Sequence, residues 1–264
     1  MLILSSAPGV CAPKRVVSTF LCTDEYVWRL VPREHIAALS FEATDRHPVV
    51  STIADAAAGI PTIRPSAETV MNHDPDLVVM YAGTMPALHA ALASAHVAVL
   101  DVPWASTLDD VRRVTAMLGE KLDARARAAA LLAEMDAKLA HAPKLTPPVR
   151  TLIYEANGYT GTGAMTTALM ARAGLEDVAA GMGPTRLDTV PVENILANPP
   201  ELLILSGDAR AVSSRADLVP HHPALAAFKG TAAWAKLTPL LCPGPWSADA
   251  VATFAALGAK ARAR

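Results

Sequence analysis

The chain has 264 residues, of which 52% are hydrophobic and 18% are charged, and its formal net charge is -2 at pH 7. A chain of this size and hydrophobic content can bury a substantial core, which excludes a disordered or fibrous protein. The charge balance lacks the basic excess that neutralises phosphates, so we expect no nucleic-acid partner. No run of about 18 apolar residues occurs without a charge or a proline, so we expect no membrane-spanning helix.

The cysteines and the N-terminus say little about the compartment. Cys11, Cys22 and Cys242 form no CxxC pair, which argues against a zinc cage or a thioredoxin-type motif. Cys22 and Cys242 could pair in an oxidising compartment, but free buried thiols are the expectation. The first twelve residues show no evident signal peptide, and it stays open whether Met1 is the natural start and whether Cys11 is lipidated.

Short apolar strands and helical patterns alternate along the first half of the chain. The expected strands are 15–18, 36–39, 60–63, 77–80 and 97–100. The expected helices are 24–30, a short helix with Ser66 as its N-cap that ends before Pro75, 86–95, and 106–118 closed by Gly119. This order predicts a parallel sheet with helices on both faces.

The longest helical pattern runs from Asp123 to Ala142, and a helix of that length spans about 30 Å. After it the alternation resumes, with strands at 150–155, 202–205 and 240–242 and helices at 162–174, 223–228 and 248–261. The predicted organisation is therefore an N-terminal lobe over 1–120, a connecting helix over 121–143 and a C-terminal lobe over 144–264.

An internal repeat supports two lobes. Residues 66–80, SAETVMNHDPDLVVM, align without a gap on residues 191–205, PVENILANPPELLIL. The aligned pairs include Glu68 with Glu193, Val70 with Ile195, Met71 with Leu196, Pro75 with Pro200 and Asp76 with Glu201. One unit of helix, proline turn and buried strand is thus expected in each lobe, although chance similarity between βα units could explain part of the match.

The chain resembles the periplasmic substrate-binding proteins of ABC importers for iron siderophores, haem and cobalamin. The features that carry the resemblance are the repeat, the long helix, PKRVVS near the start and GYTGTGAMTTALMARAGLEDVA in the second lobe. The resemblance covers nearly the whole chain. It implies an α/β fold of two Rossmann-like lobes with parallel sheets, joined by a single long rigid helix, with the ligand in the cleft between the lobes. It also implies a periplasmic monomer without cofactor or catalysis, which delivers a metal chelate or macrocycle to an ABC permease dimer with its ATPase.

The same resemblance implies that Glu68 and Glu193 dock on the permease. A carboxylate in a first helical turn is favoured by the helix dipole and stays exposed, which suits recognition of a charged partner. Alternatively, both residues are only first-turn acids. The sequence departs from the family in lacking a recognisable signal peptide, and Pro199 with Pro200 tightens the turn of the second copy.

Ligands in such folds lie where loops leave the carboxyl ends of the strands, so side chains at these strand exits are the candidate ligand-binding residues. They are Phe20, Cys22, Phe41, Asp45, Tyr81, Trp104, Tyr159, Arg210 and Trp246. Their aromatic rings suit a large planar or macrocyclic ligand, and ordinary packing is the alternative. The arginines expected in loops are few, namely Arg46, Arg64, Arg186 and Arg210, which favours a largely apolar or neutral macrocycle.

The sequence leaves two alternative functions. The chain has no GxSxG or HExxH motif, and GYTGTG at 158–163 lacks the GxGxxG order, so a cytosolic α/β enzyme is only an alternative and no catalytic residue is expected. A related importer protein that binds a bare metal ion is the other alternative. Its ligands would come from His47, His221, His222, Glu42, Asp45 and Glu155, but the two adjacent histidines could instead cap the helix at Pro223.

Overall fold

The computed structural model describes residues 12–46, 50–161, 163–183, 189–207, 209–210, 212 and 214–263. The chain divides into two compact units, each described here by itself. Unit 1 comprises Met1–Asp45, Ile53–Trp104 and Arg113–Ala130, and unit 2 comprises Arg46–Thr52, Ala105–Arg112 and Leu131–Arg264. Within the described ranges, no helix is both long enough and apolar enough to cross a membrane.

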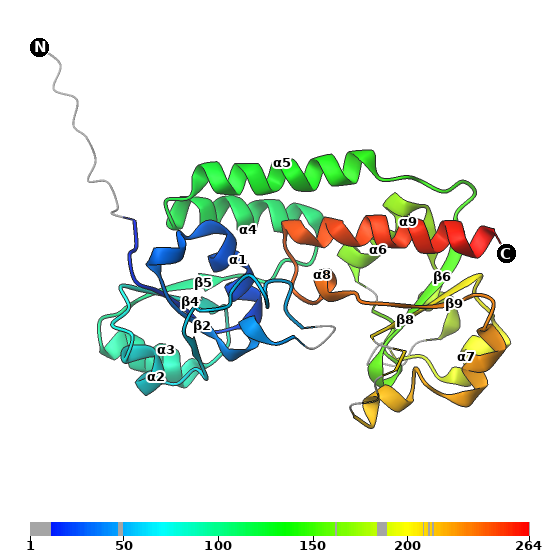
Figure 1. Cartoon of the computed structure of the whole chain (residues 1–264), viewed down its shortest axis with the longest axis horizontal. Helices are drawn as coiled ribbons and strands as arrows, with labels where there is room; N and C mark the ends of the chain where they lie inside the picture. The colour runs from blue at the N-terminus through cyan, green and yellow to red at the C-terminus, as the bar shows by residue number, and fades with distance from the viewer. Residues whose placement is uncertain are drawn as a thin grey trace, which may run out of the picture. The chain divides into compact units, whose positions relative to one another are not determined.

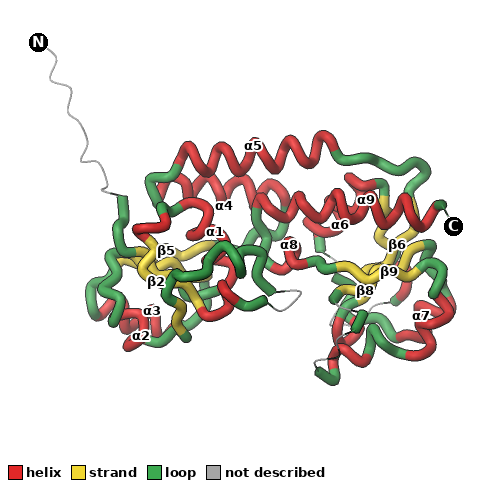
Figure 2. The backbone as a smooth tube through the Cα atoms, in the orientation of Figure 1, coloured by secondary structure: helices red, strands yellow, loops and turns green. Residues whose placement is uncertain are grey.

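Unit 1 is built on a parallel sheet that contains β2 and β5 (Figures 1 and 2). The sheet has five strands in the order β3-β2-β1-β4-β5. Its strands are β1 Val16–Ser18, β2 Ile36–Ser40, β3 Thr62–Ile63, β4 Leu77–Tyr81 and β5 Ala98–Val102. Its shorter helices are α1 Leu21–Leu30, α2 Ala67–Met71 and α3 Pro86–Ser94. The core contains fully buried apolar side chains of the central strands, such as Val17 and Val78, packed against Leu92 of α3. Continuous apolar strands of this kind are typical of a parallel sheet that is covered on both faces.

Unit 2 contains a second parallel sheet, with the order β7-β6-β8-β9. Its strands are β6 Val149–Tyr154, β7 Leu175–Asp177, β8 Leu202–Ser206 and β9 Ala232–Ala235, and its helices include α6 Ala164–Ala173, α7 Val192–Ala197, α8 Thr238–Leu241 and α9 Asp249–Arg262. The predicted α/β fold with parallel sheets is therefore confirmed. Short 3-10 helices fill the connections of both units: η1 Arg33–His35, η2 Phe41–Thr44, η3 Ala156–Gly158, η4 Ala179–Met182, η5 Ala216–Leu218, η6 Pro223–Phe228 and η7 Pro245–Ala248.

Two helices follow β5, namely α4 (Leu108–Lys121) and α5 (Arg125–His141). The prediction that α4 ends at Gly119 is wrong. The helix runs through this glycine, which allows α5 to approach closely: a Cβ there would lie 2.5 Å from the Ala128 Cβ. The break comes at Asp123, whose φ of +53° is left-handed and incompatible with a continuing α-helix. The long helix is close to its predicted length, and both units contain residues of α5.

The internal repeat is a repeat of structure. In the alignment of the two copies, Ala67 and Val192 occupy the same position, and they are the first residues of α2 and α7. In the same alignment, β4 and β8 begin and end at the same positions. Each copy has its helix start, proline turn and buried strand at the same positions, so the similarity is more than a chance echo of βα units.

The turn of each copy is fastened to the first strand of its own sheet in the same way. In unit 1 the Asp76 carboxylate accepts a hydrogen bond from the Arg15 N–H (3.0 Å), and the Asp76 N–H donates to the Arg15 carbonyl (3.1 Å). In unit 2 the Glu201 carboxylate and N–H make the same two bonds with the backbone of Arg150, both 2.9 Å long. The aligned acids are therefore structural, and they fix the turn that follows each repeated helix.

Candidate functional site

The carboxyl edge of the unit 1 sheet carries a row of aromatic and basic side chains. Taken across the sheet from β3 to β5, they are Arg64, Phe41, Phe20, Tyr81 and Trp104, one at or just after the last residue of each strand. We call these five residues the carboxyl-edge strip. Four of them were predicted as ligand-binding residues. Arg64 was noticed only as a loop arginine, although it directly follows the predicted third strand and the same rule would have selected it.

Direct ring contacts join members of the strip. The Phe20 and Tyr81 rings meet edge to face with centroids 5.5 Å apart, and the Tyr81 and Trp104 centroids are 5.4 Å apart. At the other side, the guanidinium carbon of Arg64 lies 4.0 Å from the centroid of the Phe41 ring. Such pairs hold the rings in fixed orientations, since aromatic and cation-π contacts are directional.

Burial divides the strip into supporting and presenting side chains. Tyr81 is buried, and burial raises the pKa of its phenol well above the ordinary value, with the nearby Tyr26 adding to the effect. The phenol of Tyr81 is neutral at physiological pH, as that of an ordinary tyrosine is, and burial strengthens this preference. Trp104 is 54% exposed and Phe41 is 39% exposed, so these two rings form the accessible apolar surface of the edge. An apolar surface of this kind, bordered by one guanidinium, is suited to binding a flat ligand with little charge.

A buried carboxylate lies under the strip. Asp24, in the first turn of α1, is fully buried and accepts hydrogen bonds from the N–H (3.0 Å) and the hydroxyl of Ser40 and from the hydroxyl of Ser18. Burial is the main reason why the pKa of Asp24 rises to about 7; the three hydrogen bonds oppose the rise, and the nearby Glu42 adds to it. Ser18 and Ser40 are the last residues of β1 and β2, so Asp24 ties together the two strand ends that carry Phe20 and Phe41.

The other two unit 1 candidates do not join the strip. Asp45 is exposed at the end of η2. Cys22 is buried in α1 and is disulfide-bonded, and Cys242 is disulfide-bonded as well. The expectation of free thiols is therefore wrong.

The carboxyl edge of the unit 2 sheet is more polar. Glu155 follows β6 and accepts a hydrogen bond from the hydroxyl of Ser206, the last residue of β8, while burial raises its pKa. Gly161 passes directly over this carboxyl group with φ +57°, and a Cβ there would lie 3.0 Å from Glu155 Oε1, so only glycine fits without strain. Tyr159 is 41% exposed, and its carbonyl accepts a hydrogen bond from the Glu155 N–H (2.8 Å).

The strand that was predicted to lead to Trp246 needs correction. The strand expected at 240–242 is instead the short helix α8, which has Pro239 in its first turn, where proline is well tolerated. Trp246 lies in η7 and is only 5% exposed, and its indole N–H donates to the Cys242 carbonyl (2.8 Å). Because the ring is buried and its polar group is satisfied, Trp246 presents little surface to a ligand. Arg210 is exposed in a turn after β8.

No bare-metal site is found among the described residues: no three His, Cys, Asp or Glu side chains come together there. His47, which was part of that hypothesis, lies outside the described residues. The His221 ring packs on Trp234 with centroids 4.4 Å apart, and its Nδ1 donates to the Asp217 carbonyl (2.7 Å). His222 caps η6 by accepting a hydrogen bond from the Ala224 N–H (3.3 Å), so only one of the two adjacent histidines is a cap.

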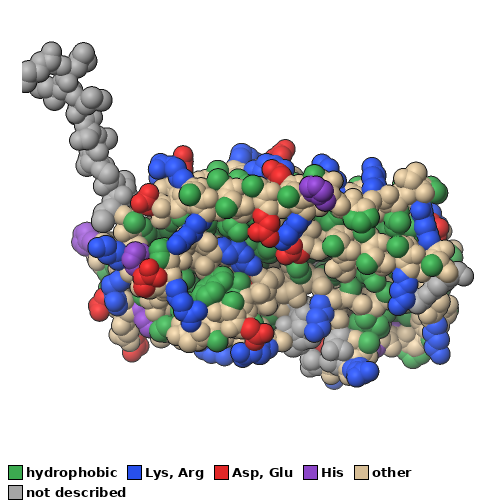
Figure 3. Space-filling view, turned by 45° about the horizontal axis from the view of Figure 1, so that its top comes forward, with side chains coloured by type: hydrophobic (Ala, Val, Ile, Leu, Met, Phe, Trp, Pro, Cys, Tyr) green, Lys and Arg blue, Asp and Glu red, His purple; other side chains and the backbone are tan. Residues whose placement is uncertain are grey.

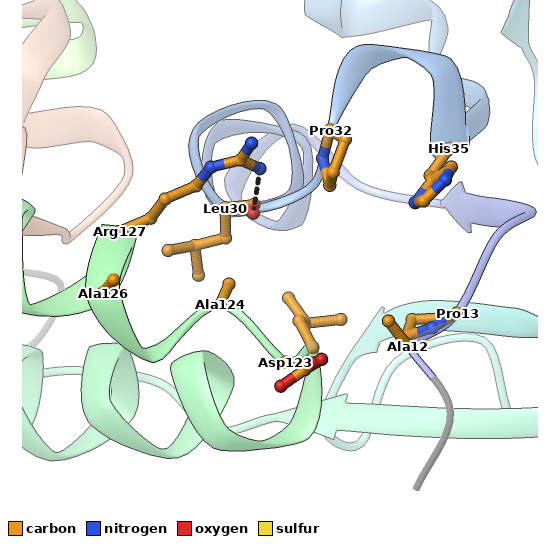
Figure 4. Close-up of a pocket in the computed structure, with 10 residues that line it drawn as sticks. Ala12, Pro13, Leu30, Pro32, His35, Asp123, Ala124, Ala126 and Arg127 are labelled. Atoms are coloured by element: carbon orange, nitrogen blue, oxygen red, sulfur yellow. Dashed lines mark hydrogen bonds between the residues drawn. The ribbon is translucent and has the colours of Figure 1, made fainter.

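A pocket of about 270 Å³ lies elsewhere in unit 1 (Figure 4). It is lined by Pro13 before β1, by Pro32 and His35 before β2, and by Asp123 and Arg127 near the start of α5. The Arg127 guanidinium donates to the Leu30 carbonyl (2.8 Å), as the dashed line in Figure 4 marks. The pocket therefore lies near the amino ends of β1 and β2, and ligands of parallel α/β sheets bind at the opposite, carboxyl ends.

The two predicted docking residues are exposed and equivalent. Glu68 and Glu193 each lie in the first turn of their helix, α2 and α7. Ser66 caps α2 by accepting a hydrogen bond from the Thr69 N–H, so α2 begins where the sequence predicts.

On the face shown in Figure 3, hydrophobic side chains are interspersed among charged ones.

A family model described as periplasmic binding protein matches residues 24–234, which is most of the chain. No protein with curated annotation matches the sequence significantly.

Solved structures show the same fold at low sequence identity. The periplasmic heme-binding protein RhuT from Roseiflexus sp. RS-1, in apo form, aligns with a TM-score of 0.73 and 21% identity, over 94% of this chain and 99% of that one. The periplasmic heme-binding protein BhuT, in complex with two hemes, gives 0.68 and 24%, over 94% and 98%. The ABC-type Fe3+-hydroxamate transport system protein from Saccharomonospora viridis DSM 43017 gives 0.66 and 20%, over 93% of each chain.

Proposed function

We propose that this chain, which belongs to the periplasmic binding protein family, is the substrate-binding component of an ABC importer that carries an iron chelate or a tetrapyrrole. Members of this family bind substrates and do not transform them, so the chain is a binding protein and not an enzyme. It works in the periplasm and hands its ligand to a permease that is driven by an ATPase. The structural neighbours support this substrate class, because two of them bind heme and one belongs to a ferric hydroxamate transport system.

The observation that carries the proposal is the carboxyl-edge strip. Five strands place a side chain each along one edge, and Trp104 and Phe41 present accessible rings there. A flat macrocycle or the organic shell of an iron chelate would stack on these rings. Arg64, held over Phe41, would pair with an acidic substituent of the ligand.

The ligand assignment is tested by native mass spectrometry of the purified protein with hemin, a ferric hydroxamate and cyanocobalamin. The proposal predicts a stoichiometric adduct with at least one of the three. Trp104→Ala should weaken that adduct, whereas Trp28→Phe, on a half-buried ring of α1 outside the strip, should leave it unchanged. No adduct with any of the three compounds would overturn the assignment of the substrate class.

Glu68 and Glu193 are proposed to dock on the permease, one from each copy of the repeat. Their exposure and equivalent placement support this role. Glu68→Lys and Glu193→Lys should keep the affinity for the ligand but lose uptake in a reconstituted transporter, because the change affects only the contact between the proteins. Normal uptake by both variants would show that the acids are only first-turn residues.

A further inference from the structure

Each copy of the repeat exposes a large apolar side chain one helical turn after its glutamate. In α2 this residue is Met71, which is 37% exposed, and in α7 it is Leu196, which is 41% exposed. Residues three apart on a helix lie on the same face, so each apolar side chain is a neighbour of Glu68 or Glu193.

The two helices match in exposure position by position. Over the first five residues of each helix, the order in both is half-buried, exposed, half-buried, buried, exposed. The buried residues, Val70 and Ile195, anchor the helices in the cores of their own units. Folding therefore buries the same position in both copies and leaves the acid and the large apolar residue among the exposed positions of each.

The exposure of these apolar side chains recurs in both copies of the repeat. A large apolar side chain in contact with water gains no free energy from folding, and one exposed example needs no explanation. Here the same residue class recurs at the equivalent position of a repeat whose two copies share few identical residues. The turn that follows is fixed to the first strand by Asp76 in unit 1 and by Glu201 in unit 2, so both helices are held in place before any partner binds.

We infer that Met71 and Leu196 are apolar contacts of the permease, each inserted beside the salt bridge that its neighbouring glutamate forms. This inference rests on the proposed function and adds the chemistry of the partner surface. The permease would offer two sites, each with an apolar pocket next to a basic side chain. Since each unit brings one copy of the same acid and apolar pair, the two halves of the permease dimer that the proposed function assumes would offer equivalent sites.

The test measures the affinity of the ligand-loaded protein for its cognate permease and ATPase complex, reconstituted in lipid nanodiscs, at low and at high salt. Met71→Ser and Leu196→Ser should each weaken binding by about fivefold to thirtyfold at both salt concentrations, because apolar contacts are not screened by salt. Glu68→Gln and Glu193→Gln should instead reduce the dependence of the affinity on salt, since exposed ion pairs are screened. Leu241→Ser, which changes a similarly exposed leucine of α8, is the matched control and should bind like the wild type.

A double exchange tests the equivalence of the two partner sites. If the sites are the same, Met71→Leu combined with Leu196→Met should bind with unchanged affinity, because each pocket already accepts both side chains. Serine variants that bind like the wild type, or an exchange that weakens binding as much as serine does, would overturn the inference while leaving the proposed function intact. A wild-type protein that binds its chelate but never the permease would overturn both the inference and the delivery step.

Discussion

The buried carboxyl group of Asp24 should make the stability of the protein depend on pH. Its pKa is about 7 in the folded protein, against 3.8 for an ordinary aspartate. Between these values the folded protein holds a proton that the unfolded chain has lost, so the free energy of unfolding falls as the pH rises from about 4 to about 7. The free energy of unfolding changes by about 1.4 kcal/mol per pH unit within this window, so it should fall by about 3 kcal/mol between pH 5 and pH 8.

Asp24→Asn provides the comparison, because an amide has the shape of the protonated acid. It can accept from the Ser40 N–H and donate to a serine hydroxyl. Urea unfolding followed by tryptophan fluorescence at pH 5, 6, 7 and 8 should show the variant close to the wild type at pH 5 and more stable at pH 8. Other ionisable groups act in both proteins, so the difference between the two slopes isolates Asp24. Parallel pH profiles would refute the reasoning that the buried carboxyl group retains its proton.

Two further predictions concern the scaffold. Gly174→Ala should destabilise unit 2 by about 1 to 3 kcal/mol in thermal or chemical unfolding, because φ is +76° there and a Cβ would lie against the backbone of Leu145; an unchanged stability would mean that this turn tolerates a side chain. Asp76→Ala and Glu201→Ala should each lower the free energy of unfolding by about 1 kcal/mol, because each removes a hydrogen bond that fixes a turn. Hydrogen exchange should become faster at the Arg15 amide in the first variant and at the Arg150 amide in the second. Unequal effects would show that the two turn contacts are not equivalent.

The sequence predicted the elements whose physical signals are local. The Ser66 cap, the proline turns and the apolar runs at 77–80 and 202–205 marked the repeat to within about a residue. The strands β7 and β9 were missed, since LED and AAWA show no alternation and become strands only by pairing with β6 and β8.

The candidate site likewise contains residues that local sequence signals predict and residues that depend on which strands are neighbours. Four residues of the carboxyl-edge strip came from the rule of strand exits, which needs only the order of strands along the chain. The strand expected before Trp246 was wrong, because the short apolar run at 240–242 lies partly in the helix α8, and so few residues do not distinguish a strand from a helix. The stacking of Arg64 on Phe41 depends on β3 lying next to β2, and a single sequence does not show which strands are neighbours.

The binding of a chelate by the carboxyl-edge strip is tested most directly by titrating the protein with hemin, a ferric hydroxamate and cyanocobalamin while following tryptophan fluorescence. The account predicts saturable quenching by at least one of them. Trp104→Ala should weaken that affinity by about 1 to 3 kcal/mol, the range for an aromatic anchor, and Trp28→Phe should leave it unchanged. Tight binding that Trp104→Ala leaves untouched would contradict the assignment of the site to this edge.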